Sequence, residues 1–171
     1  ADQKKCFLSF LTVDIEKYLM KKDNYTGRQM IYVGSLIERK GLDLLLEALA
    51  LLPDDITLVI VGEGQERDLL QKQAGELGIS DRIRFAGFLE GEALKELYHE
   101  SDLFVLPTRE DCFGLVILEA MCASLPVVCS RYADGAYDLL KEGENGFLVD
   151  PFDAAQFAET IDRMFTREDL A

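Results

Sequence analysis

Two short segments carry residue types that could bind an anionic, hydroxyl-rich ligand. The first, residues 108–130, opens with three adjacent charged residues that end at Asp111. From Phe113 onward it is apolar or small except for one charge, Glu119. A carboxylate among apolar neighbours is costly to desolvate unless a hydrogen-bond donor meets it. Glu119 is therefore a candidate ligand-binding acid; the alternative is a carboxylate satisfied by its own scaffold.

The residue types of 113–123 predict a helix, and Pro126 ends helical geometry before a short Val-Val strand. Gly114 lies near the start of this helix, where backbone N–H groups without intrahelical acceptors and the helix dipole attract anions. Asp111 could serve as an ordinary N-cap there and still face a ligand. An anion-binding helix start followed by a lone acid suits a phosphorylated ligand with hydroxyl groups.

The second segment, residues 34–41, follows a predicted strand and places Arg39 and Lys40 directly before Gly41. Lys40 could form a charge-assisted contact with a diphosphate; the alternative is a solvated loop lysine. A Gly-x-Gly beginning at Gly62 resembles part of a nucleotide loop, but alone it is a weak signal and a simple turn explains it better. The complete dinucleotide-binding and Walker patterns are absent from the sequence.

Apolar strands alternate with helices over most of the chain. We expect strands at 30–34, 56–61, 83–87, 103–106, 127–129 and 146–149, and helices at 42–52, 64–78, 92–99, 113–123, 134–141 and 153–165. This alternation predicts an α/β fold, a doubly wound, Rossmann-like six-stranded parallel sheet in the order 3-2-1-4-5-6. In that order the loops after strands one and four meet at the ligand crevice, which brings both segments to one site. Upstream, we expect a strand at 6–13, a short helix or loop at 15–23 and a linker at 23–28.

Charge and composition exclude several classes of partner. The 171 residues include 18 Lys plus Arg and 32 Asp plus Glu, for a net charge of −14. This balance argues against nucleic acid and anionic lipid as partners, and the apolar runs are too short to span a bilayer. Four cysteines without C-x-x-C spacing are typical of reduced thiols, so we expect a cytoplasmic location. With a single histidine, we expect no metal site and no cofactor.

Over roughly residues 32–165 the chain resembles the C-terminal, donor-binding half of family 4 (group 1) retaining glycosyltransferases of the GT-B architecture. The resemblance runs through YVGSLIERKGLDLLLEAL, LVIVGEG, RIRFAGFL, SDLFVLPTREDCFGLVILEAMCASLPVV and EGENGFLVDPFD. It implies that residues 1–28 lead in from a preceding domain and that residues 29–171 form the nucleotide-sugar-binding domain. The N-terminal acceptor domain would lie outside this sequence, and this segment alone would be inactive or nearly so.

The resemblance also implies a reaction and partners. A sugar would pass from a nucleotide-diphosphate sugar, with UDP or GDP as the nucleotide, to an acceptor hydroxyl with retained configuration. The acceptor would be a carbohydrate or a lipid-linked molecule held by the other half, at the inner membrane face or elsewhere in the cytoplasm. Two alternatives stay open, namely a GT-B epimerase or phosphorylase-like enzyme and a non-catalytic nucleotide-sugar-binding module.

By resemblance, roles pass to single residues of this chain. Lys40 matches the lysine of a basic pair that grips the diphosphate, whereas Ser35 stands where the family usually has arginine. Asp111 and Glu119 match the two acids of an E-x7-E motif, with the donor sugar and the ribose hydroxyls as their expected contacts. The expected catalytic residues are Asp111, Glu119 and Lys40, and the expected donor-binding residues are Gly34, Ser35, Arg39, Lys40, Gly62, Phe88, Leu89, Cys112, Phe113, Gly114, Leu115, Val116 and Glu119. Ser124 is a further departure, because the family usually has Gly near this position.

Overall fold

The computed structural model describes residues 15–19 and 27–166. The predicted strand at 6–13 lies outside the described residues. The segment predicted as helix or loop is described at its start, as helix α1 (Ile15–Tyr18), and the predicted linker only at Gly27 and Arg28. Among the described residues, every helix is too short or too polar to cross a bilayer.

Within the described residues, six strands form one parallel sheet. They are β1 (Gln29–Val33), β2 (Thr57–Val61), β3 (Ile83–Gly87), β4 (Leu103–Leu106), β5 (Val127–Ser130) and β6 (Gly146–Val149). Their order is β3-β2-β1-β4-β5-β6, and every neighbouring pair is parallel. The predicted α/β class and strand order are confirmed, and three strands (β3, β4 and β6) have the predicted bounds.

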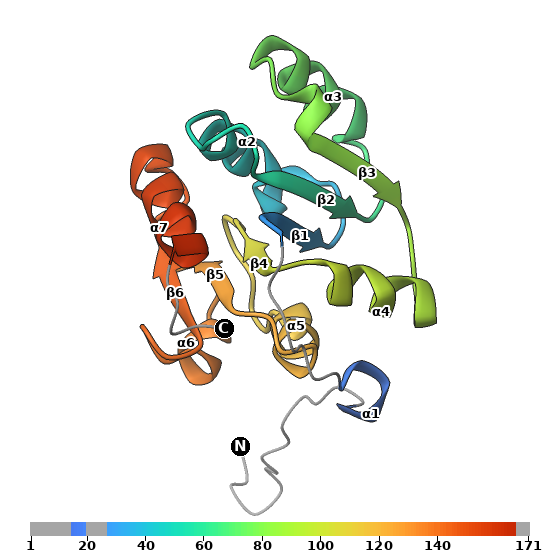
Figure 1. Cartoon of the computed structure of the whole chain (residues 1–171), viewed down its shortest axis with the longest axis vertical. Helices are drawn as coiled ribbons and strands as arrows, with labels where there is room; N and C mark the ends of the chain where they lie inside the picture. Colours follow the sequence, from blue (N-terminus) through green and yellow to red (C-terminus); the bar gives the residue numbers. More distant parts are fainter. Residues whose placement is uncertain (1–14, 20–26, 167–171) are drawn as a thin grey trace, which may run out of the picture.

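Two rows of helices cover the sheet. The helices that follow α1 are α2 (Leu42–Ala50), α3 (Arg67–Glu76), α4 (Gly91–Glu100), α5 (Leu115–Cys122), α6 (Ala136–Leu139) and α7 (Ala154–Thr166). Figure 1 shows α7, α2 and α3 along one face of the sheet and α6, α5 and α4 along the other, with α1 beside α5. All residues of the central strands β4 and β5 are buried. Strands covered on both faces need apolar residues at every position, which explains their continuous apolar runs.

Several helices are shorter than predicted, and both ends of α5 lie close to residues in the left-handed region. The predicted helix at 113–123 starts two residues later, because Gly114 has φ 55° and ends the preceding turn rather than beginning the helix. Its far end is followed by Ser124 at φ 60°, a conformation that glycine adopts without strain. This conformation gives a physical reason for the Gly that the resemblance expects there. The predicted helix at 134–141 is reduced to the single turn of α6.

Gly41 permits the closest approach between the loops that follow β1 and β4. It precedes α2 with φ 67°, and a Cβ added to it would lie 2.3 Å from the carbonyl oxygen of Pro107. That carbonyl belongs to the backbone and cannot rotate away as a flexible side chain would. The two loops can therefore touch only because residue 41 lacks a side chain.

We expect Gly41→Ala to destabilise the chain by roughly 3 kcal/mol, through left-handed strain plus the clash with Pro107. The matched control is Gly78→Ala, since Gly78 has φ 72° but open space around its Cβ position. The control should lose about 1 kcal/mol, from strain alone. Denaturant unfolding of both variants measures the difference, and equal losses would show that the two loops can separate at little cost.

Candidate functional site

The loop after β1 (residues 34–41) and the loop after β4 (residues 107–114) lie side by side at the carboxyl ends of these neighbouring strands. The carbonyl oxygen of Arg39 accepts a hydrogen bond from the N–H of Arg109 at 2.9 Å. The buried hydroxyl of Thr108 lies 3.0 Å from the same oxygen. Backbone and side-chain contacts thus join two segments that are far apart in the sequence.

Lys40 and Asp111 form an ion pair across these loops, with Lys40 Nζ donating to Asp111 Oδ2. Their side chains are only 17% and 13% exposed, so water screens the pair less than it screens a surface pair. The other carboxylate oxygen, Oδ1, accepts from the N–H groups of Phe113 at 3.4 Å and Gly114 at 3.3 Å. The structure therefore brings Lys40 and the start of α5 together, as the strand order predicts.

The pKa of Asp111 reflects these contacts. Burial acts to raise it, but the hydrogen bond and charge of Lys40, together with the N–H groups of Gly114 and Phe113, outweigh burial and hold the pKa below its ordinary value. Asp111 is therefore an anion at neutral pH. Burial first, and the Asp111 charge second, raise the pKa of the Tyr32 hydroxyl on β1 and that of the Cys129 thiol on β5, the latter to about 12. The charge of Asp111 thus acts on residues of both β1 and β5.

A second ion pair holds the β4 loop against α2. Arg109 donates two hydrogen bonds to the carboxylate of Asp43, at 2.7 and 2.6 Å, and a third to the carbonyl oxygen of Glu38 at 2.7 Å. Arg39, one of the expected donor-binding residues, is exposed and donates to the carbonyl oxygen of Glu110 at 3.1 Å. The side chain of Ser35 is exposed, and its carbonyl oxygen accepts from the Tyr32 hydroxyl at 3.0 Å.

The Gly-x-Gly after β2 has a structural role. A Cβ on Gly62 would lie 1.9 Å from the carbonyl oxygen of Gly34, and a Cβ on Gly64 would lie 2.1 Å from that of Leu36. The N–H of Leu36 donates to the carbonyl oxygen of Glu63 at 2.9 Å. Both glycines thus allow the backbone of the β2 loop to pack directly against that of the β1 loop. This packing explains the two glycines without a ligand.

The β3 loop extends this edge of the sheet. The N–H of Gly62 donates to the carbonyl oxygen of Gly87 at 2.8 Å. The expected donor-binding residues Phe88 and Leu89 follow directly after this hydrogen bond. Phe88 is 68% exposed and Leu89 is half-buried. An aromatic side chain exposed to this degree has its ring available to pack against a planar group.

Glu119 lies farther along α5, half-buried, and its Oε2 accepts a hydrogen bond from the Tyr98 hydroxyl of α4 at 3.2 Å. Burial first, and then the charge and hydrogen bond of Glu119, raise the pKa of Tyr98 well above its usual range. Tyr98 is therefore a neutral donor that meets one oxygen of the acid. The scaffold thus meets one of the two carboxylate oxygens of Glu119.

The remaining predicted residues surround the start of α5. Cys112 and Phe113 are exposed, Leu115 is 37% exposed and Val116 is half-buried. Leu115 and Val116 occupy the first two helical positions, whose N–H groups have no acceptor within the helix. The described cysteines, Cys112 among them, are free thiols.

Sequence reasoning missed the residues that support the site rather than line it. These residues are Tyr32, Asp43, Tyr98 and Thr108. Each of them contacts a partner on another loop or helix, or fixes the loop that it precedes. The charged triplet that contains Arg109 was the one sequence signal for these contacts. An acidic residue in a helix, or a tyrosine in an apolar segment, has many ordinary explanations and does not by itself indicate a site.

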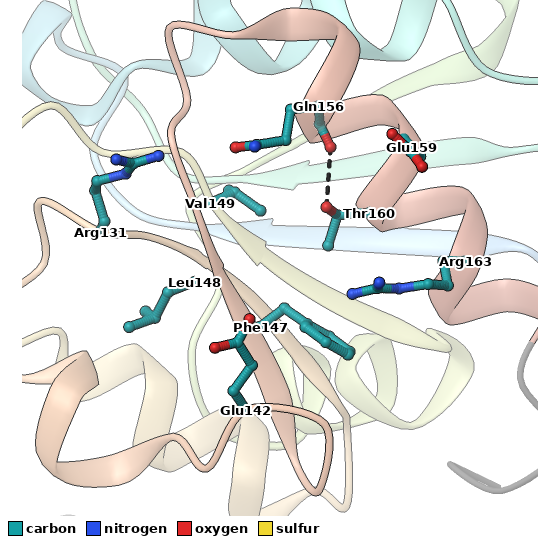
Figure 2. Close-up of a pocket in the computed structure, with 9 residues that line it drawn as sticks. All are labelled: Arg131, Glu142, Phe147, Leu148, Val149, Gln156, Glu159, Thr160 and Arg163. Carbon is teal, nitrogen blue, oxygen red and sulfur yellow. Dashed lines mark hydrogen bonds between the residues drawn. The ribbon is translucent and has the colours of Figure 1, made fainter.

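A separate cavity of about 320 Å³ lies between β6 and α7. Figure 2 shows Arg131, Glu142, Gln156, Glu159 and Arg163 around it, with the Thr160 hydroxyl donating to the carbonyl oxygen of Gln156 at 2.9 Å. None of the described residues that line it belongs to the predicted site. Neither here nor elsewhere in the described part of the chain do three His, Cys, Asp or Glu side chains group as potential metal ligands.

Comparison with known proteins identifies relatives of this chain. The family described as Glycosyl transferases group 1 matches residues 15–171. The lipopolysaccharide core biosynthesis glycosyltransferase LpsE of Rhizobium meliloti is 38% identical over 138 residues, which cover 81% of this chain and 39% of LpsE. The chain thus spans well under half the length of this curated relative.

Solved structures agree with the fold. Alr3699/HepE of Anabaena, crystallised in complex with UDP and glucose, aligns with a TM-score of 0.83 and 28% identity over 93% of this chain and 47% of HepE. The C-terminal domain of the group 1 glycosyl transferase LpcC of Francisella tularensis aligns with a TM-score of 0.79 and 25% identity. That alignment covers 92% of this chain and 90% of the domain. The fold is thus that of one half of the GT-B glycosyltransferases, the C-terminal half.

The ion pair predicts a pH dependence of stability. Because the pKa of folded Asp111 lies below its ordinary value of 3.8, its stabilising contribution is present above that value and is lost as pH falls through the lowered pKa. Lys40→Met should therefore cost about 1 kcal/mol near pH 6 and much less near pH 2.

Urea unfolding of the variant and of the unsubstituted chain at both pH values measures this difference. The contributions of the other carboxylates largely cancel, because both proteins contain them. Lys72→Met is the control, because Lys72 is 74% exposed and pairs with the exposed Glu76 on α3. A Lys40→Met loss that is equally large at both pH values would show that the pair does not lower the pKa of Asp111.

Proposed function

Because the chain belongs to the group 1 glycosyl transferases, we propose that it binds a nucleotide-diphosphate sugar and forms the donor-binding half of a retaining glycosyltransferase. The complete enzyme transfers the sugar to the hydroxyl of a carbohydrate or lipid-linked acceptor. Residues 29–171 form the donor domain, and residues 1–28 lead into it. No cofactor takes part, and the enzyme works in the cytoplasm or at the inner membrane face.

One observation carries the proposal, namely the convergence of Lys40 with the N–H groups of Phe113 and Gly114 on a single carboxylate. These donors come from two loops at the crevice where doubly wound sheets bind ligands. Three donors that hold a carboxylate can equally hold a phosphate, whose oxygens accept the same bonds. The diphosphate of a nucleotide sugar is an anion of this kind.

The same donors suit the chemistry. When the sugar leaves, negative charge grows on the diphosphate oxygens, and fixed donors aimed at that charge lower the barrier. Lys40 supplies a full positive charge, and the first N–H groups of α5 supply the helix dipole. In this proposal protein groups, rather than a metal ion, balance the charge of the leaving group.

The other predicted residues take the remaining parts of the donor. Glu119, with one oxygen held by Tyr98 at 3.2 Å, accepts hydrogen bonds from the ribose hydroxyls through its other oxygen. Phe88 and Leu89 border the base. Asp111 contacts the sugar once its own partners are released. Because HepE was crystallised with UDP and glucose, a UDP-sugar is the first donor to test and a GDP-sugar the second.

The central test is nucleotide binding to this chain and its variants. UDP, GDP and ADP are titrated while the unfolding temperature is followed, since a ligand that binds only the folded state stabilises it. We expect one nucleotide to raise this temperature and Lys40→Ala to weaken its binding about tenfold or more. Lys72→Ala, which removes an exposed lysine on α3, should bind as the unsubstituted chain does.

Unchanged affinity in Lys40→Ala would remove Lys40 from the site, and failure of all three nucleotides to bind would contradict the proposed function. Transfer of sugar is measured in the same preparations. The chain spans less than half of LpsE, and we expect it to bind the donor and to turn over slowly or not at all.

Glu119→Gln tests the ribose contact. The variant should bind the preferred nucleotide about tenfold more weakly, because a neutral amide accepts hydrogen bonds less strongly than a carboxylate. The same nucleotide without ribose hydroxyls should bind both proteins equally. Glu96→Gln, at an exposed position of α4, is the control. If Glu119→Gln loses stability while its nucleotide affinity is kept, Glu119 serves the scaffold alone.

A further inference from the structure

The groups proposed to bind the diphosphate already hold an anion in this structure. Lys40 Nζ donates to Asp111 Oδ2, and the N–H groups of Phe113 and Gly114 donate to Oδ1 at 3.4 and 3.3 Å. The carboxylate therefore engages the Lys40 ammonium and two of the backbone N–H groups at the crevice. A phosphate at the same place would need these same hydrogens.

The Asp111 side chain can move while its backbone stays in place. The N–H of Asp111 donates to the carbonyl oxygen of Tyr132 at 3.1 Å, and the N–H of Asp134 donates to that of Asp111 at 2.8 Å. The β5 loop thus fixes the peptide groups on both sides of the Cα atom. Rotation about the side-chain torsions can therefore move the carboxylate while both backbone–backbone hydrogen bonds of Asp111 stay in place, at the cost of its contacts with Lys40, Phe113 and Gly114.

Two anions cannot share these donors without strong repulsion. The Asp111 side chain is 13% exposed and that of Lys40 is 17% exposed, so little water lies between the charges to screen them. In such a poorly hydrated place the effective dielectric constant is far below that of water, so two like charges in van der Waals contact repel strongly. A bound diphosphate and the carboxylate in its present position therefore exclude one another.

We propose that Asp111 is an internal competitor, whose carboxylate fills the diphosphate subsite of the donor-free chain and must be displaced when a donor binds. This inference rests on the proposed function and extends it by making Asp111 a determinant of affinity for the phosphate part of the ligand. Displacement frees the carboxylate for the sugar hydroxyls. A nucleotide whose sugar offers no such hydroxyl gains no compensating contact, so the competition favours the sugar-bearing donor over the bare nucleotide product.

The decisive variant is Asp111→Asn. Asparagine keeps an Oδ1 atom that can accept from Phe113 and Gly114, so the turn is preserved while the negative charge is lost. Glu110→Gln removes the same charge from the neighbouring exposed position of this loop and is the matched control. Binding of inorganic pyrophosphate, UDP and uridine to the three proteins is measured by titration calorimetry.

We expect Asp111→Asn to bind pyrophosphate and UDP at least about tenfold more tightly than the unsubstituted chain. Glu110→Gln should change either affinity less than about threefold, because an exposed charge is well screened. Uridine, which has no phosphate, should bind all three proteins alike. Pyrophosphate that binds Asp111→Asn no more tightly than the unsubstituted chain, or binds neither, would overturn the inference.

The same titrations separate this inference from the proposed function. If the substitution strengthens pyrophosphate binding but UDP and GDP never bind better than pyrophosphate, the competition stands and the nucleotide-binding proposal fails. If nucleotides bind well and the substitution strengthens neither ligand, the competition fails and the proposal stands.

A readout on the unsubstituted chain guards against a variant that does not fold. In an NMR titration with pyrophosphate to saturation, the Asp111 carboxyl carbon and the Gly114 amide should both shift as their hydrogen bond is exchanged. Resonances of these two groups that stay in place at saturation would overturn the inference without any substitution.

Discussion

The close approach of the loops after β1 and β4 is the constraint on which the site depends. These loops are brought together by the direct pairing of their strands, in which Met30 lies opposite Leu103 and Ile31 opposite Phe104. Lys40 and Asp111 are 71 positions apart in the sequence, and the burial of the strands offsets the entropic cost of closing this loop. The packing of the core therefore determines where the two loops of the site lie.

The electrostatics of the chain act on two length scales. The net charge of −14 repels an anionic ligand at a distance. At physiological ionic strength this field is screened over about 8 Å, so the electrostatic potential at a bound phosphate would be set by its immediate neighbours. Around the crevice those neighbours are Lys40, the start of α5 and the carboxylate of Asp111. The balance between one cation and one acid therefore governs the site more than the overall charge does.

The site combines a backbone that is held by hydrogen bonds with one carboxylate, that of Asp111, which is held through its side-chain contacts alone. Glycines at 41, 62 and 64 allow backbone segments to touch, and the hydrogen bonds at Tyr132 and Asp134 hold the β4 loop from the other side. In the proposed function, this frame holds the N–H groups in place before the donor binds, as electrostatic stabilisation of a leaving group requires. The Asp111 carboxylate satisfies these donors in the meantime, so that none of the three is left without an acceptor.

The sequence alone determined the fold class, the strand order and the elements that meet at the crevice. Continuous apolar runs can be satisfied only in a sheet covered on both faces, and alternation with helices makes that sheet parallel. Lys40 and the start of α5 could be paired because strand order dictates which loops are neighbours. Close bounds for strands were also within reach, because buried strands end where polar residues begin.

Only the tertiary structure decided how individual side chains are engaged. It showed that α5 begins after Gly114, that Asp111 holds Lys40 and two N–H groups, and that Tyr98 meets Glu119. It also explained why residue 62 is glycine, because a Cβ there would lie 1.9 Å from the carbonyl oxygen of Gly34. These contacts join residues that are distant in the sequence, and the distances that define them leave no periodic pattern along the chain. A residue's type limits the bonds that it can make, but only the folded neighbours choose among them.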